Sequence, residues 1–106
     1  MGALVEEKHI VSNLKRNDLL ALLKQKIDES INNGKAICIS VESSFMTFMN
    51  NLYITDYEID EKGLYISGDF DISINLGHYE TELKYDDSYD ESFTIVHNDV
   101  EVVLVF

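Results

Sequence analysis

The side chains of this 106-residue chain that could do chemistry are mostly carboxylates. Twenty Asp and Glu residues stand against eight Lys and Arg residues, which gives a formal net charge of −12. From Ala36 onward the only bases are Lys62 and Lys84, so the excess lies in the second two-thirds of the chain. Nucleic acid is bound through Lys and Arg. This distribution therefore argues against direct nucleic-acid binding and predicts a basic protein partner.

A group of acidic residues with one tyrosine is the candidate partner-binding site. Strand alternation places several of them on one face of two neighbouring strands, and the rest lie in the loop that follows. The site consists of Asp69, Asp71, Glu80, Glu82, Asp86, Asp87, Tyr89, Asp90 and Glu91. A general acid needs a cleft that shifts its pKa, and a flat strand face provides none. We therefore expect recognition of a basic surface, with a merely solvated acidic face as the alternative.

The histidines and the single cysteine show no pattern of a metal or catalytic site. His9, His78 and His97 lack metal-ligand spacing. Cys38 lies among isoleucines, where a buried thiol is inert. The loop 86–91 lacks the spacing and the glycine of a calcium-binding EF-hand loop, and phosphate-loop, dinucleotide and nucleophile-elbow motifs are missing. We expect no metal, no cofactor and no enzymatic activity.

The sequence also predicts a cytoplasmic protein that does not associate with membranes. One cysteine excludes an internal disulfide, and residues 1–7 lack the basic region of a signal peptide. No run approaches the roughly 18 apolar residues that a membrane span requires.

One amphipathic helix is predicted near the start of the chain. Asn17 or Asp18 is expected to cap its first turn, and Gly34 to end it in the left-handed conformation. Its apolar stripe consists of Leu20, Leu23, Ile27 and Ile31. Residues 1–14 fit either a short helix or an edge strand.

The stretch Leu64–Leu76 alternates strictly between apolar and polar residues, which predicts one long strand that bends at Gly68. A four-residue loop over 60–63 pairs it with residues 52–59. The expected pairs are Ile59 with Leu64, Tyr57 with Ile66 and Tyr53 with Phe70. A three-residue loop would set Glu58 opposite Ile66 instead, but the first register matches apolar with apolar residues.

Two further hairpins are predicted. Gly77-His78 forms a two-residue turn that pairs Ile72 with Leu83 and brings Asp71 beside Lys84. Asn98-Asp99 forms the last turn, and it pairs Ile95 with Val102 and Phe93 with Leu104. Ala36–Val41 is a further strand, and Val102–Phe106 is expected to be a central strand covered by the helix.

Residues 43–52 allow two interpretations. Phe45, Phe48, Met49 and Leu52 have helical spacing behind Ser44, but the same segment fits an irregular strand. We expect these side chains to close the core over the sheet. The alternative is an exposed contact site, through which Phe45, Phe48 and Met49 form a homo-oligomer.

These elements predict an α+β protein, with one principal N-terminal helix packed on a strongly bent antiparallel sheet of five or six strands, and residues 1–106 as a single domain.

The predicted function is that of a small acidic non-enzymatic binding protein that docks on a basic, nucleic-acid-binding partner. In size and charge alone the chain is similar to phage-type inhibitors, including anti-CRISPR proteins and DNA mimics that compete with nucleic acid, and to immunity proteins for basic toxins. The alternatives are a small-ligand module with a pocket at Cys38, Tyr53 or His97, and an oligomeric structural domain.

Overall fold

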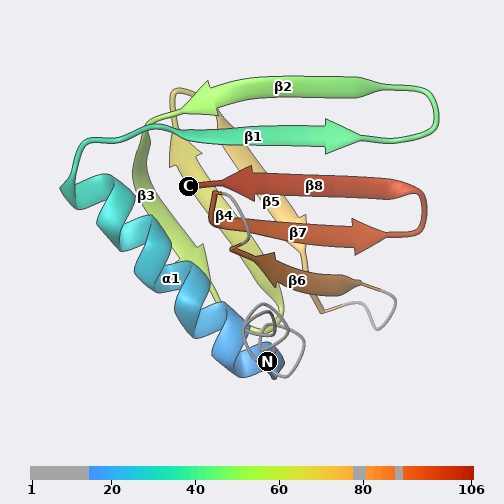
Figure 1. Cartoon of the computed structure of the whole chain (residues 1–106), viewed down its shortest axis with the longest axis horizontal. Helices are drawn as coiled ribbons and strands as arrows, with labels where there is room; N and C mark the ends of the chain where they lie inside the picture. Colours follow the sequence, from blue (N-terminus) through green and yellow to red (C-terminus); the bar gives the residue numbers. More distant parts are fainter. Residues whose placement is uncertain (1–14, 78–80, 88–89) are drawn as a thin grey trace, which may run out of the picture.

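The computed structural model describes residues 15–77, 81–87 and 90–106, and these form one helix and eight strands (Figure 1). The elements are α1 Arg16–Asn32, β1 Ile37–Glu42, β2 Thr47–Leu52, β3 Ile54–Ile59, β4 Gly63–Gly68, β5 Asp71–Asn75, β6 Glu82–Asp86, β7 Ser92–His97 and β8 Val100–Val105. The predicted α+β class, with one N-terminal helix on antiparallel strands, is confirmed. The open question about residues 1–14 lies outside the described residues.

The strands form two sheets instead of one bent sheet. A five-stranded sheet has the order β2-β1-β8-β7-β6, and a three-stranded sheet has the order β3-β4-β5. Figure 1 shows the smaller sheet behind the larger one, with α1 along one side of the pair. The helix packs chiefly against β3 and β6, one strand from each sheet. The core is therefore a sheet-on-sheet layer that the helix closes along one side.

Helix α1 buries three of the four residues of the predicted stripe, and the fourth, Ile31, is half-buried against the core. Leu20, Leu23 and Ile27 are buried in the core, because they project toward the two sheets on one side of the helix. The predicted cap is wrong: the helix begins at Arg16, and Lys15 is the N-cap without a side-chain hydrogen bond. Gly34 has a φ of 62°, which confirms the left-handed C-terminal end. Within the described ranges, no helix is both long and apolar enough to cross a membrane.

The stretch Leu64–Leu76 is not one bent strand. It reverses direction after Gly68, and β4 pairs antiparallel with β5, so that Leu64 lies opposite Ile74 and Ile66 opposite Ile72. A reversal through three residues keeps even-numbered residues opposite even-numbered ones, so the apolar face continues without a phase change. Alternation alone therefore could not distinguish a long strand from this hairpin.

Two of the predicted hairpins are confirmed in their central registers. In β3–β4, Ile59 lies opposite Leu64 and Tyr57 opposite Ile66. The register shifts between Ile54 and Asp56, so Ile54 lies opposite Gly68 and the predicted Tyr53–Phe70 pair does not form. In β7–β8, the pairs Ile95–Val102 and Phe93–Leu104 are both present.

The hairpin predicted at Gly77-His78 is wrong. β5 pairs with β4, and β6 pairs with β7 in the other sheet, so the predicted pairs Ile72–Leu83 and Asp71–Lys84 are absent. Both residues of the predicted apolar pair have apolar partners on other strands: Ile72 lies opposite Ile66, and Leu83 lies opposite Ile95. The Gly77-His78 sequence favours a turn locally, but the observed strand pairing allows the two sheets to bury their apolar faces against each other.

Residues 47–52 form strand β2, so the helical interpretation of this segment is wrong. β2 pairs with β1 along its whole length at the edge of the larger sheet. Only Leu52 of the strand is buried. The expectation that these side chains close the core is also wrong, because Phe45 is 85% exposed and Met49 67% exposed.

Candidate protein-binding site

The structure divides the predicted acidic site into two groups. Asp69 and Asp71 lie at the reversal between β4 and β5 in the smaller sheet. The other described members lie on β6 or in the segment that joins it to β7, at an edge of the larger sheet: Glu82, Asp86, Asp87, Asp90 and Glu91. Glu80 and Tyr89 lie outside the described residues. The first group was expected beside β6 only because β5 was expected to pair with it.

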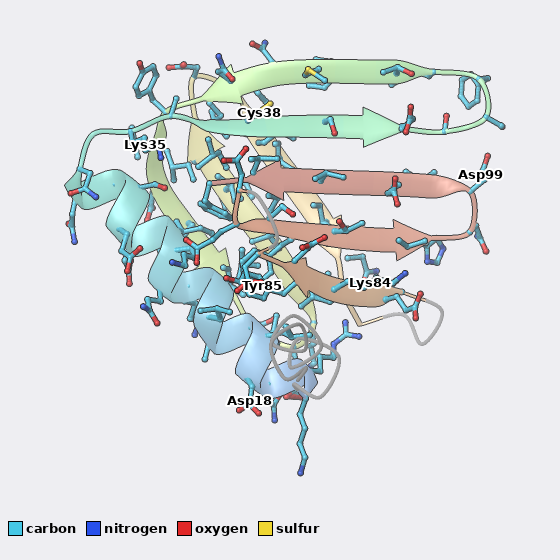
Figure 2. All side chains as sticks on the ribbon, viewed as in Figure 1. Asp18, Lys35, Cys38, Lys84, Tyr85 and Asp99 are labelled. Carbon is cyan, nitrogen blue, oxygen red and sulfur yellow. The ribbon has the colours of Figure 1, made fainter. Side chains whose placement is uncertain are left out.

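Glu91 forms an ion pair and a hydrogen bond within the molecule. The Lys26 Nζ atom on α1 lies 2.6 Å from a Glu91 carboxylate oxygen, and the Tyr85 hydroxyl donates to the other oxygen at 2.8 Å. The hydrogen bond from Lys26, then that from Tyr85, holds the pKa of Glu91 below its ordinary value. The same contact raises the pKa of Lys26, while burial raises that of Tyr85. Figure 2 shows Tyr85 between β6 and the helix, so this network fixes α1 to the larger sheet.

Two further contacts hold the helix to its surroundings. The Tyr57 hydroxyl on β3 donates to Asp28 Oδ1 of α1 at 2.6 Å, and this hydrogen bond raises the pKa of Tyr57 to about 12. At the start of the helix, the Arg16 guanidinium donates to the backbone oxygen of Leu76 and, at 3.2 Å, to that of Thr81. The pKa shifts of the ionisable groups at the helix interface therefore result from burial and from contacts that hold the helix in place.

The side of the larger sheet that faces away from the smaller one is here called the outer face. Cross-strand pairing places the following residues on it: Thr47, Met49, Asn51, Cys38, Ser40, Glu42, Glu101, Val103, Val105, Ser92, Thr94, Val96, Glu82, Lys84 and Asp86. All of these residues are exposed or half-buried. β8 is central in its sheet, as predicted, but the helix does not cover its outer face. The helix was expected to cover this face of β8 because Val103 and Val105 are apolar. Instead, α1 packs along the side of the two sheets, against β3 and β6.

Exposed carboxylates gather toward one end of the outer face. Glu42 on β1 lies directly opposite Glu101 on β8, and Glu101 in turn lies opposite Val96, which lies opposite Glu82. The two like charges in direct cross-strand contact destabilise the sheet. Among the described residues of this face the only base is Lys84, which lies 3.8 Å from Glu82. The face therefore carries four acids and one base, a net charge of −3.

A shallow depression of about 350 Å³ lies at the same end, where the β1–β2 and β7–β8 turns meet. Glu42, Asp99 and Glu101 are among its lining residues. The Ser44 hydroxyl donates to Asp99 Oδ2 at 2.8 Å and ties the two turns together. This hydrogen bond lowers the pKa of Asp99, which therefore stays ionised. Figure 2 shows Asp99 at this tip, far from the helix.

Glu42 and Glu101 were missed by the sequence analysis. Each stands at the end of a predicted strand without a local acidic run around it. They meet only because β1 pairs with β8, two strands that are separated by more than half of the chain. No periodic signal within either segment could have joined them.

A second hollow, of about 360 Å³, lies between the two sheets and bears on the small-ligand alternative. Its lining includes Ile74, Val102 and His97, and His97 Nδ1 lies 3.1 Å from Thr81 Oγ1. The other two residues expected there lie elsewhere: Cys38 is on the outer face, and Tyr53 is exposed. In the part of the chain that the structure describes, no cluster of His, Cys, Asp or Glu could hold a metal ion.

Comparisons of the chain with protein-family models, curated proteins and solved structures found no match.

Proposed function

We propose that this protein is a small acidic, non-enzymatic binding protein whose outer face docks on a basic partner that itself binds nucleic acid. The observation that carries the proposal is the exposed pair Glu42–Glu101 at the end of the outer face. Like charges placed directly opposite each other reduce stability. A cationic group from a partner removes this repulsion on binding, so the arrangement favours a basic ligand.

The spacing of the carboxylates supports a partner that lies across the strands. Neighbouring strands are about 4.8 Å apart, so Glu42 and Glu82, three strands apart, are separated by roughly 14 Å. Basic side chains three or four residues apart on a helix are about 5–6 Å apart, which is close to the strand spacing. A basic helix can therefore place successive cations over this row and into the depression beside Asp99.

The proposal is tested by capture from a cell lysate on immobilised protein, with bound proteins identified by mass spectrometry. The expected result is a basic, nucleic-acid-binding protein that is enriched at low salt and displaced by duplex DNA. Raising the salt to about 0.5 M should release it, because screening shortens the Debye length to a few ångströms.

Two variants of equal net charge test the site: the first changes the outer face, and the second is its control. E42Q/E82Q/E101Q, the outer-face variant, removes three acids of the proposed site. D56N/E58Q/E61Q removes three exposed acids of β3 and its following turn. The outer-face variant should lose the captured protein and the other variant should retain it. Equal capture by both variants would show that net charge, and not this face, attracts basic proteins.

A further inference from the structure

Strand β2 differs from the other sheet edges of the molecule. The two sheets have four edge strands, β2, β6, β3 and β5, and all except β2 contain acidic residues. The uncharged run around β2 extends over 13 residues, from Ser43 to Thr55, in a chain whose net charge is −12. Charged side chains on an edge strand normally prevent pairing with another chain. β2 has no such protection.

The backbone of β2 offers a short, defined set of free hydrogen-bonding groups. The hydrogen bond from Ser43 N to Met46 O, at 2.9 Å, fixes the alternation of the β1–β2 ladder. Thr47, Met49 and Asn51 therefore direct their N–H and C=O groups away from β1. The Asn50 side chain accepts a hydrogen bond from Asn51 N at 2.8 Å and so occupies that position. Within the described part of the chain, the N–H groups of Thr47 and Met49 donate to no acceptor.

Exposed apolar side chains project from both faces of the sheet in the same segment. Met49 projects from the outer face and is 67% exposed. Phe48 projects from the opposite face, where it is 39% exposed and makes an edge-on contact with Phe70 at 6.1 Å between ring centroids. In Figure 1 β2 forms the outermost strand of the larger sheet, so a further strand can approach it along its length.

We propose that a second copy of this chain occupies this edge, and that two β2 strands pair antiparallel about a two-fold axis at Phe48. In this register Thr47 lies opposite the partner subunit's Met49, and the two residues exchange both backbone hydrogen bonds. The symmetry repeats the exchange, which gives four hydrogen bonds. They use the free groups of Thr47 and Met49 and leave the Asn50–Asn51 contact intact.

This register is self-complementary in its side chains as well. Phe48 lies beside the partner subunit's Phe48 in a non-hydrogen-bonded pair, where side chains approach most closely. Aromatic cross-strand pairs are among those that stabilise sheets. A second copy of this chain is favoured as the partner of this edge because β2 contains no charged residue, so pairing two β2 strands brings no like charges together. The two outer faces then lie on the same side of one continuous sheet.

The dimer is expected to be weak and to strengthen with salt. Six residues of edge pairing bury less than the roughly 1,600 Å² of a standard interface. Each copy carries −12, so screening reduces the repulsion between the two chains. The salt dependence is therefore opposite in sign to that of the proposed basic partner, and the proposal does not rest on that function.

Sedimentation velocity over about 10 µM to 1 mM protein tests this inference at low and high salt. The expected result is a reversible change from the 12.1 kDa monomer toward twice that mass, at lower concentrations when salt is high. Hydrogen exchange followed by NMR should show amides of Thr47 and Met49 that become protected as the concentration rises. A monomer throughout this range, or amide exchange independent of concentration, would overturn the inference.

Two variants test the register. M49P removes an N–H that β1 does not use, so the β1–β2 ladder is retained while two of the four intermolecular bonds are lost. The dissociation constant should rise at least about tenfold. M49K provides a second test with less risk to folding, and Y65K, at an exposed tyrosine of the smaller sheet, is its control of equal charge. A dimer that survives both Met49 variants, or that Y65K also disrupts, would contradict the β2 pairing.

Discussion

Replacing Gly68 with alanine should destabilise the protein strongly, because the backbone between β2 and β3 passes very close to this glycine. A Cβ atom at position 68 would overlap the backbone carbonyl oxygen of Tyr53 and lie 2.8 Å from Leu52 Cδ1. The first of these atoms belongs to the backbone, so a side-chain rotation cannot relieve the overlap. Overpacking typically costs 1–3 kcal/mol. We expect G68A to lose about 2–3 kcal/mol of unfolding free energy, at the upper end of that range.

Gly63 provides the matched control in the same strand. A Cβ atom there would meet only Ile74 O, at 3.4 Å, which is an ordinary contact. G63A should therefore change the unfolding free energy by less than about 1 kcal/mol, and in the stabilising direction, because alanine restricts the unfolded chain.

Urea unfolding followed by circular dichroism measures both changes, and thermal unfolding provides a second reading. For a domain of this size, the loss in G68A corresponds to a decrease in Tm of roughly 9–13 °C. If G68A were as stable as the wild-type protein, or if G63A lost as much stability, the close approach of β4 to the end of β2 would be wrong.

Three further predictions concern the helix and its anchors. L23A, at a fully buried position of α1, should lose about 2–5 kcal/mol, whereas L22A at a half-buried position should lose less, as measured by urea unfolding. Y57F should lose about 1 kcal/mol because Asp28 loses its donor, while Y65F should be neutral within error. Glu91 has a lowered pKa in the folded state, so its contribution is present above the ordinary pKa of 4.5 and is lost as the pH falls through the folded value. E91Q should therefore be about 0.5–1 kcal/mol less stable than the wild-type protein at neutral pH, with the difference disappearing in acid; a difference that grew toward low pH would contradict the Lys26–Glu91 assignment.

The sequence alone predicted those parts of the fold that local patterns determine. The apolar stripe of α1 and the registers of the β3–β4 and β7–β8 hairpins depend on residues close together in the chain. The stretch Leu64–Leu76 was misjudged because its alternation is compatible with both a straight strand and a symmetric reversal. What decides between them is the burial of Ile66 and Leu64 against a second sheet, and this is a property of the whole fold.

The candidate site could be predicted only in part. The acidic character of the second two-thirds of the chain was evident, and Glu82 and Asp86 do lie on the outer face. Glu42 and Glu101 could not be assigned to it, because the β1–β8 pairing joins distant segments. Conversely, Glu91 was included although Lys26 engages it, since a contact between the helix and a distant loop leaves no local pattern.

The salt dependence of partner binding by the outer-face variant E42Q/E82Q/E101Q tests the central claim most directly. With the captured partner purified, titration calorimetry gives the dissociation constants of the wild-type protein and of this variant at several salt concentrations. We expect weaker binding by the variant at low salt and a shallower dependence on salt, because fewer charges take part. Equal dissociation constants and equal salt dependence for the two proteins would contradict docking through the outer face.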